Sequence, residues 1–449
     1  MITLEQHVEQ NARLRPQQTA VVCGDQVLTY ADLWQRVSEE ASRLQPRLTP
    51  GRIVSVRTSQ TAAFLVSYFA LHCCGCTVAP MEHDMPEALF QQLTDRLSRY
   101  DLPPGTADVL YTTGTTGRSK GVMISHRAIM ASAENLVEGQ GFSPGLAFIV
   151  SGPLNHLGSL SKVWAVMTVG ATLVVTEGMK DLNRFFAAFD QPFPRMATFL
   201  VPASIRMLLQ FSANRLGRYQ HKIDFIETGA AAISQADMEA LRQLLPNSRL
   251  YNTYASTETG VVSTCDFSRC DCTAGCLGRP MRHSRVVITP EGHIACQGDT
   301  LMSGYVGDEE LTRSVLRDGT VYTRDVGRLD AEGRLHLAGR EDDVINVGGF
   351  KVAPTEVEGV AMELSEVLDC ICVPVSHPLA GTALKLLVVL QQGTVLDKKR
   401  LARHIASKLE RYKVPMVYEQ TDKVQRTYNG KVDRKYYVST PQSTTQNRG

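Results

Sequence analysis

The stretch Tyr111-Thr-Thr-Gly-Thr-Thr-Gly-Arg-Ser-Lys-Gly121 is the most informative in the chain. It follows a short apolar strand pattern that begins at Asp108. Backbone N–H groups and hydroxyls in such a loop can donate to phosphate oxygens, while glycine allows close approach and Lys120 adds a mobile positive charge. The loop is not a Walker A motif, because Gly121 and a second apolar stretch follow the lysine. We therefore predict a polyphosphate-binding loop, with a polar surface hairpin as the alternative.

These residues resemble the phosphate-binding motif of the adenylate-forming superfamily. That superfamily includes acyl- and aryl-CoA ligases such as 4-coumarate-CoA ligase and O-succinylbenzoate-CoA ligase, stand-alone adenylation domains, and luciferases. Four further segments match the family in the same order, so the resemblance covers nearly the whole chain. It implies that ATP is bound by the loop residues Thr112, Thr113, Gly114, Thr115, Thr116, Gly117 and Lys120.

Length and composition predict an ordinary globular protein of more than one domain. The chain has 449 residues, 43% of them hydrophobic and 21% charged, and single cores rarely grow beyond ~300 residues. A net charge of +1 gives no reason to expect nucleic acid as a partner. Eleven cysteines, an odd number, together with an N-terminus that lacks a signal-peptide pattern, lead us to expect a cytoplasmic protein with reduced thiols and no membrane span.

The N-terminal region predicts the β-α-β alternation of a parallel sheet. We expect helices at 4–14 and 62–73, a β-hairpin at 20–30, strands at 53–56 and 76–80, and helices that begin after Thr29 and Ser125. The resemblance implies an α/β fold, with a large N-terminal domain of mixed and parallel sheets. Only about thirty residues separate Pro80 from Tyr111, so we expect this chain to lack a β-α excursion that is usual in the family.

Two segments stand where the family forms its acyl pocket. His156 ends the first of them, where an amino-acid-activating domain has an aspartate that pairs with the substrate's ammonium, so histidine argues against an amino-acid substrate. The second segment runs from 225 to 233 and resembles a strand and glycine loop that lies along adenine and the acyl group. The resemblance implies roles for Gly229, Ala230 and Ala231 in this loop, and for His156, Leu157 and Val261 in the pocket.

Two further motifs imply the remaining nucleotide contacts. By resemblance, Tyr254 stacks on adenine, Thr257 binds phosphate, and Glu258 holds Mg²⁺ through the oxygen ligands that a hard cation prefers. Asp325 falls in the family's ribose motif, and a carboxylate with two acceptor oxygens suits a vicinal diol.

The segment from Gly339 to Glu358 resembles the family's hinge and the start of its C-terminal domain. We expect an N-terminal domain at 1–341 and a small, mobile α+β domain at 342–449, with strands at 371–374 and 385–390 and a helix at 398–411. The resemblance places Arg340 against the ribose or phosphates, Asp342 at the hinge, and Gly348 and Gly349 beside the tunnel for the thiol. It also makes Lys431 a catalytic residue that stabilises charge during attack on the α-phosphate.

Four cysteines, Cys265, Cys270, Cys272 and Cys276, lie within twelve residues. Four thiolates can bind zinc tetrahedrally, but the spacing lacks the paired C-x2-C pattern of structural zinc sites. The alternative is a variable loop with free thiols.

These motifs predict an enzyme that activates a carboxylic acid with MgATP and transfers the acyl group to coenzyme A. One alternative is a stand-alone adenylation enzyme that loads the phosphopantetheine of a separate carrier protein. Another is a non-catalytic nucleotide-binding relative, against which Glu258, Asp325, Asp342 and Lys431 together argue. The pocket residues are compatible with aryl, medium-chain or modified acids, and the oligomeric state is left open.

Overall fold

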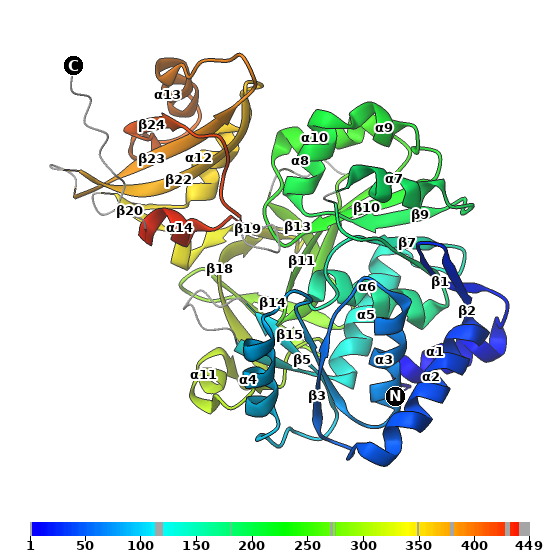
Figure 1. Cartoon of the computed structure of the whole chain (residues 1–449). Coiled ribbons are helices and arrows are strands. Elements are labelled where there is room, and N and C mark those ends of the chain that lie inside the picture. The colour runs from blue at the N-terminus through cyan, green and yellow to red at the C-terminus, as the bar shows by residue number, and fades with distance from the viewer. Residues whose placement is uncertain are drawn as a thin grey trace.

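The structure is a computed structural model (Figure 1) that describes residues 2–112, 120–179, 181–269, 273, 275–347, 350–377, 381–426 and 432–439. Strands and helices alternate through most of the chain, and the sheets are mixed. Two predicted helix starts are confirmed, because Thr29 accepts a hydrogen bond from the Asp32 N–H and Ser125 accepts one from the Ala128 N–H, both at 3.1 Å. These caps satisfy backbone donors that would otherwise lack a partner in the first turn.

The sheet that carries the phosphate-loop motif has the order β16-β6-β5-β4-β3 among the described residues. Strands β3, β4 and β5 are parallel, and β5 and β6 form an antiparallel hairpin. The strands are β3 (Ile53–Arg57), β4 (Thr77–Met81), β5 (Thr106–Thr112), β6 (Lys120–Ser125) and β16 (Gly304–Tyr305). Between the neighbouring strands β4 and β5 the chain forms the helix α4 (Glu87–Leu97).

The larger sheet has the order β14-β15-β18-β19-β13-β12-β11-β10-β9-β7-β8-β1-β2 in the described part of the chain, with β17 paired to β18. In this order, every neighbouring pair from β11-β10 to β8-β1 is parallel. Every pair from β14-β15 to β12-β11 is antiparallel. The strands are β1 (Thr19–Cys23), β2 (Gln26–Thr29), β7 (Ala147–Val150), β8 (Thr172–Val175), β9 (Met196–Phe199), β10 (Ile223–Gly229), β11 (Arg249–Ser256), β12 (Gly260–Asp266), β13 (Cys276–Pro280), β14 (Ser284–Ile288), β15 (His293–Gly298), β17 (Leu316–Arg317), β18 (Thr320–Leu329) and β19 (Leu335–Arg340).

The N-terminal hairpin completes the parallel edge of this sheet. Strand β1 pairs with β8, and the Thr172 hydroxyl donates to the Thr19 carbonyl at 2.7 Å across a separation of 153 positions. The edge of the sheet therefore combines segments that are far apart in the chain.

The main hydrophobic core lies where α3, α5 and α6 pack between the sheets. Helix α6 is apolar nearly all round, as expected for an interior helix, and Leu160, Val163 and Trp164 are fully buried. A second core lies under α7, α8 and α10. The helices before residue 342 are α1 (Leu4–Leu14), α2 (Tyr30–Leu44), α3 (Ala62–Cys73), α5 (His126–Gln140), α6 (Leu157–Val169), α7 (Leu182–Asp190), α8 (Pro202–Phe211), α9 (Ala213–Gly217), α10 (Gln235–Leu244) and α11 (Glu309–Val315).

The C-terminal elements have a separate core and lie at the upper left of Figure 1. Strands β22, β23 and β24 form one sheet, and the short pair β20-β21 precedes them. The predicted helix at 398–411 is too long: α13 ends at Ala406, and extended backbone at Glu410 separates it from a short 3₁₀ turn. The elements are β20 (Ile345–Val347), β21 (Phe350–Val352), α12 (Pro354–Ala361), β22 (Val367–His377), β23 (Gly381–Leu390), α13 (Lys398–Ala406), β24 (Val417–Gln420) and α14 (Arg434–Ser439).

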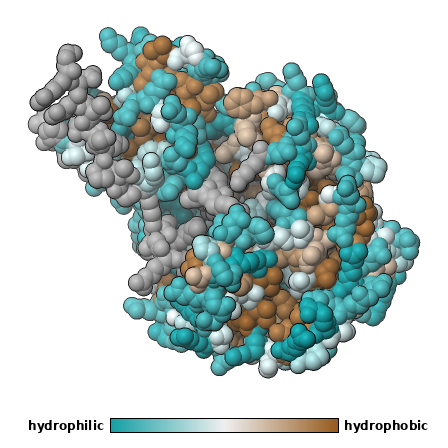
Figure 2. Space-filling model, in the orientation of Figure 1, coloured by the Kyte–Doolittle hydropathy of each residue, from teal (hydrophilic) through white to brown (hydrophobic). Residues whose placement is uncertain are grey.

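The face drawn in Figure 2 is mostly hydrophilic, with hydrophobic residues in several separate areas. Within the described ranges, every helix is either too short or too polar to cross a lipid bilayer.

Candidate active site

The ends of the predicted phosphate loop are held by a strand hairpin. Thr112 at the end of β5 lies opposite Lys120 at the start of β6, and both are half-buried. Strand β16 pairs with β6, and the Val306 N–H donates to the Gly121 carbonyl at 2.8 Å. The other predicted loop residues, Thr113, Gly114, Thr115, Thr116 and Gly117, lie outside the described residues.

Tyr305 joins the loop lysine to the predicted metal-binding carboxylate. Its hydroxyl donates to Glu258 Oε1 at 3.1 Å, and the Lys120 ammonium lies 5.5 Å from the centre of its ring. Burial and the neighbouring Glu258 carboxylate raise the pKa of Tyr305, so the phenol stays protonated and can donate. Sequence reasoning missed Tyr305. No local sequence pattern marks Tyr305, because only the pairing of β16 with β6 brings it beside the loop.

The turn that carries Thr257 and Glu258 is closed by a reciprocal pair of hydrogen bonds. The Ser256 N–H donates to Thr259 Oγ1 and the Thr259 N–H donates to Ser256 Oγ, each at 3.1 Å. The Met302 N–H also donates to the Glu258 carbonyl at 2.9 Å. Both Thr257 and Glu258 are half-buried, so the turn positions them at an accessible edge between β11 and β12.

The structure brings Tyr254, Asp325 and Arg340 together. The Tyr254 hydroxyl donates to Asp325 Oδ2 at 2.6 Å, and Arg340 Nε lies 3.2 Å from Asp325 Oδ1. Strands β18 and β19 set this contact, because Asp325 and Arg340 are register partners. Burial raises the pKa of the Tyr254 hydroxyl, which therefore stays protonated and can donate. Tyr254 is only 7% exposed, and its stacking on adenine stays a prediction. Asp342, the predicted hinge residue, pairs with Arg324.

The predicted glycine loop follows the end of β10. A Cβ at Gly229 would lie 2.8 Å from the Thr253 carbonyl oxygen, so only glycine fits there without a shift. Ala230 has a φ of +66°, which is uncommon for a residue with a side chain, and both Ala230 and Ala231 are exposed. Backbone strain of this kind concentrates at functional sites.

The predicted acyl-pocket residues differ in exposure. His156 precedes the first residue of α6 and is half-buried, Leu157 is 7% exposed, and Val261 is buried in the main core. Phe199, which sequence reasoning missed, lies between the two predicted walls of the pocket. A Cβ at Gly158 would be 3.3 Å from the Phe199 ring, and a Cβ at Gly229 would be 3.6 Å from it.

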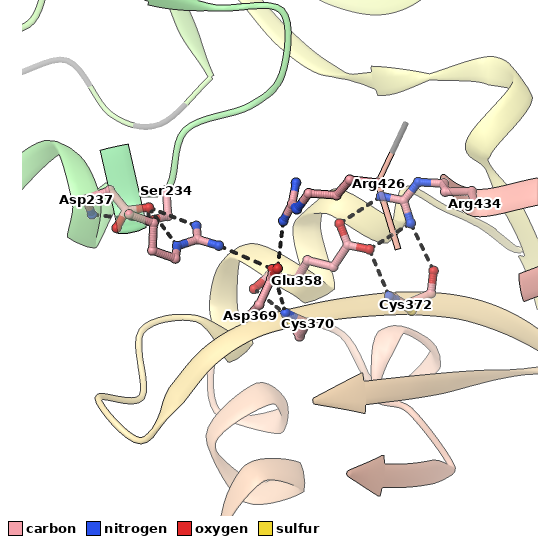
Figure 3. A network of polar contacts seen from close by, with 9 residues as sticks. Ser234, Asp237, Glu358, Asp369, Cys370, Cys372, Arg426 and Arg434 are labelled. Carbon is pink, nitrogen blue, oxygen red and sulfur yellow. Dashed lines mark hydrogen bonds and ion pairs between the residues drawn. The ribbon is translucent and has the colours of Figure 1, made fainter. Parts of the chain in front are cut away.

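Ion pairs hold the segments on both sides of the predicted catalytic lysine. Lys431 itself, like Gly348 and Gly349, lies outside the described residues. Before it, Arg426 Nη2 is 2.7 Å from Asp369 Oδ2, and after it Arg434 makes a two-pronged contact with Glu358 at 2.7 and 2.8 Å (Figure 3). Burial acts to lower the pKa of Arg434, but Glu358 outweighs it and the pKa is raised.

Arg206 on α8 links the C-terminal elements to the larger part of the molecule. Its guanidinium donates to Asp237 Oδ2 at 2.8 Å and to Asp369 Oδ1 at 3.3 Å. Asp369 therefore accepts from arginines on both sides, Arg206 and Arg426.

Two of the four clustered cysteines lie together. Cys265 and Cys276 are buried with their sulfur atoms 3.8 Å apart, whereas Cys270 and Cys272 are outside the described residues. Among the residues that the structure describes, no three His, Cys, Asp or Glu side chains are grouped to hold a metal. Zinc binding by the cysteines stays an untested alternative.

Comparisons with known proteins match most of the chain. A family model described as AMP-binding enzyme matches residues 8–98 and 101–306, and one described as AMP-binding enzyme C-terminal domain matches residues 356–431. The chain is 28% identical to a feruloyl-CoA synthase from Amycolatopsis sp., over 94% of this chain and 95% of that protein.

Two solved structures have a similar fold. One is ATP-bound MatB from Rhodopseudomonas palustris, with a TM-score of 0.85, 22% identity, and coverage of 96% of this chain and 98% of that one. The other is o-succinylbenzoate CoA synthetase from Bacillus subtilis in complex with its acyl-adenylate, with a TM-score of 0.83, 20% identity, and coverage of 97% and 98%. These structures confirm the predicted α/β fold class with a large N-terminal and a smaller C-terminal part.

Proposed function

Because the chain belongs to the AMP-binding enzyme family, we propose that it is an AMP-forming acid–thiol ligase. Family membership confirms the resemblance drawn from the sequence. In the first step a carboxylate oxygen of the acid attacks the α-phosphorus of ATP, and pyrophosphate leaves. In the second step the thiolate of coenzyme A attacks the acyl carbon, and AMP leaves.

The observation that carries this proposal is the contact of Lys120, Tyr305 and Glu258 at the base of the phosphate loop. It places a cation and an oriented carboxylate beside the segment proposed to bind the triphosphate. A Mg²⁺ ion suits the oxygen donors of Glu258 and would neutralise phosphate charge there. Thr257, on the same turn, would donate its hydroxyl to phosphate.

The second group of polar residues fits the nucleoside. Asp325, already held by Tyr254 and Arg340, would accept hydrogen bonds from the two ribose hydroxyls. The exposed residues Ala230 and Ala231, which follow the buried Gly229, support close approach of adenine or the acyl group.

Lys431 is the residue that we propose to stabilise charge on the α-phosphate during adenylation. We also propose domains at 1–341 and 342–449 that turn about Asp342 between the steps, with Gly348 and Gly349 beside the thiol's pantetheine arm. The separate core of the C-terminal elements supports this division. We further propose a cytoplasmic location, which the odd number of cysteines supports.

Pyrophosphate release tests the function directly. Purified protein is given MgATP and a panel of aryl, short-chain, long-chain and amino acids, each with and without coenzyme A. Release with one class of acid, together with an acyl-CoA product, is the expected result. Adenylate without acyl-CoA would favour loading of a separate carrier protein, and no release from any acid would contradict an enzymatic role.

The variant Lys431→Ala tests the assigned catalytic residue. We expect it to lower acid-dependent pyrophosphate release by roughly 100-fold or more, because a preorganised charge at a developing anion contributes that much to catalysis. Undiminished release would mean that Lys431 has another role.

A further inference from the structure

Two buried cysteines have their side chains in contact. Cys265 Sγ on β12 lies 3.8 Å from Cys276 Sγ on β13, and the two residues are 4% and 0% exposed. Both are free thiols, and they form a small buried cluster apart from the larger hydrophobic cores. A buried cysteine often serves only as a small apolar residue, and that role does not require a second cysteine beside it. The contact therefore points to chemistry between the two sulfur atoms.

An irregular stretch of β13 brings Cys276 beside Cys265. The register of β13 with β19 shifts between Cys276 and Gly278, and Gly278 has a φ of +72°. A Cβ at Gly278 would lie 1.9 Å from the Thr264 carbonyl oxygen, so only glycine lets β13 approach β12 this closely. On β11, Asn252 is the register partner of Cys265, and its Nδ2 donates to the Cys276 carbonyl at 3.0 Å. These contacts fix the backbone on both sides of the two thiols.

The two thiols lie beneath a short surface segment. Of the described residues between them, Arg269 and Thr273 are exposed, and Ser268 and Gly275 are half-buried. Surface turns open locally at a lower free energy than the global unfolding of a protein. A small oxidant can therefore reach the sulfur atoms without unfolding the sheet.

We propose that Cys265 and Cys276 form a reversible disulfide bond when the protein meets hydrogen peroxide, and that this bond stabilises the fold. The inference does not depend on the proposed function. The sulfur atoms of a disulfide are ~2.05 Å apart, so the two thiols must approach by roughly 1.8 Å, which small rotations of the side chains can supply.

The oxidation proceeds in two balanced steps. In the first, one thiol attacks the peroxide, the O–O bond breaks, and a sulfenic acid and one water form. In the second, the other thiol attacks the sulfenic sulfur, the S–O bond breaks, and the disulfide and a second water form. The two sulfur atoms together lose two electrons, which reduce the peroxide. A low-molecular-weight thiol restores both cysteines by exchange.

The bond would join strands that lead to both halves of the proposed nucleotide site. Strand β12 begins at Gly260, just after the turn of Thr257 and Glu258, and β13 pairs with β19, which ends at Arg340. A cross-link between residues 265 and 276 restricts mainly the unfolded chain, because the folded strands already hold the thiols in contact. We therefore expect higher stability and little change in activity.

Peptide mapping tests the pairing. The reduced protein is treated with hydrogen peroxide, its free thiols are alkylated, and it is digested with trypsin without reduction. Cleavage after Arg269 separates Cys265 from Cys276, so only a disulfide keeps their peptides together. The double variant Cys270→Ser and Cys272→Ser leaves Cys276 as the only cysteine in its peptide, and we expect the linked peptides to form in this variant as in the wild type.

Thermal unfolding tests the effect of the bond. Peroxide should raise the midpoint temperature of the wild type by about 4 °C, and a thiol reductant should reverse the change. Cys276→Ala should abolish this rise. Cys296→Ala is the matched control, because Cys296 is equally buried at 0% exposed and lies in a different cluster, so this variant should keep the rise. If Cys276→Ala does not fold, Cys265→Ala takes its place.

Three results would overturn the proposal. One is that Cys265 and Cys276 are alkylated in full after peroxide treatment. Another is that either of them pairs with Cys270 or Cys272 instead. The third is that the reduced protein holds one zinc ion per chain and loses it in Cys265→Ala, since the thiols would then serve a metal. Acid-dependent pyrophosphate release is measured separately, so a failure of the proposed function does not affect this test.

Discussion

Tyr305 shows how a single hydroxyl can position a carboxylate. Its hydroxyl donates to Glu258, and the Lys120 ammonium lies 5.5 Å from the centre of its ring. The loop lysine and the proposed magnesium ligand come from segments far apart in the chain, and Tyr305 is the side chain that contacts both.

Replacing Tyr305 with Phe removes the hydroxyl and keeps the ring. A hydrogen bond to a charged acceptor contributes ~1.5–3 kcal/mol, so we expect acid-dependent pyrophosphate release to fall roughly tenfold or more. The measurement is steady-state kinetics over a range of Mg²⁺ concentrations. Tyr219→Phe is a matched control, because Tyr219 donates to Asp190 at 2.8 Å in an exposed pair outside the site. Equal losses in the two variants would contradict a positioning role for Tyr305.

His72 lies in a buried cluster of titratable side chains, from which we expect a dependence of stability on pH. Its Nε2 is 3.0 Å from Asp108 Oδ1, its Nδ1 is 3.9 Å from Glu5 Oε2, and its ring contacts that of His126. Burial acts to lower the pKa of His72, but Asp108 and Glu5 outweigh it and the net shift is upward. A raised pKa means that the folded state binds the proton more tightly than the unfolded state does.

We therefore expect His72 to stabilise the fold fully below its unfolded pKa of ~6.5, and to lose this contribution as pH rises through the higher folded pKa. Thermal unfolding of the wild type and of His72→Gln, measured from pH 6 upward, tests this expectation. Over that pH range, the midpoint temperature of unfolding should fall further for the wild type than for the variant. If the midpoint temperatures of the two proteins change with pH in parallel, His72 does not bind a proton more tightly in the folded state.

At the scale of the element, ion pairs hold the described residues that come before and after Lys431 in the chain. Arg426 is paired with Asp369 on β22, and Arg434 is paired with Glu358 on α12 (Figure 3). The Cys372 N–H also donates to Glu358 Oε1 at 2.8 Å, so Glu358 joins α12, β22 and α14. We expect the placement of Lys431, and with it the proposed catalytic role, to depend on these two ion pairs.

Glu358→Gln should weaken the adenylation step more than the thioester step. It removes the carboxylate that Arg434 contacts twice and leaves the longer, 3.5 Å contact with Asp343, so we expect pyrophosphate release to fall about tenfold because Lys431 is less well placed. Transfer from added acyl-adenylate to coenzyme A should stay within about twofold, because Lys431 is proposed to act only in the first step. Glu363→Gln is the control, since Glu363 pairs with His404 and Lys408 elsewhere in the C-terminal elements. Equal loss in both steps would indicate a general structural defect.

The sequence predicted the elements with strong local signals. Helix α3 begins and ends at the predicted residues, and the caps Thr29 and Ser125 were found, because side-chain spacing and capping chemistry are local. The end of α13 was missed, since Leu409 continues the apolar spacing although the helix stops at Ala406. Tyr305 and Phe199 could not be found with their partners, because only sheet pairing and helix packing bring those positions together.

Across the whole molecule, Arg206 is a contact between the two parts of the chain. Its guanidinium contacts Asp237 in the first turn of α10 and Asp369 on β22, which Arg426 also contacts. The side chains are 11–22% exposed, which limits screening by water and salt.

Arg206→Ala should loosen the C-terminal elements. Loss of this partly buried contact should lower the free energy that holds the C-terminal elements against α8 and α10 by ~1 kcal/mol. That change corresponds to roughly a fivefold rise in the population in which these two parts are separated. Limited proteolysis near residues 341–347 should become faster by about that factor, as open populations govern cleavage when closing is rapid. Arg184→Ala, which removes an exposed pair with Glu177, should leave the cleavage rate unchanged. A similar increase in both variants would contradict the contact's role.

The pairing of β1 with β8 has a consequence for synthesis on the ribosome. Strand β1 cannot pair with β8 until residue 172 has been synthesised. At ~5–20 residues per second, the 153 positions that separate residues 19 and 172 take roughly 8–30 s to make. During that time the apolar strand Thr19–Cys23 can pair with β2 but lacks its parallel neighbour β8. Strand β1 is therefore made well before its parallel neighbour in the larger sheet, and nascent-chain chaperones should engage this strand until β8 has been made.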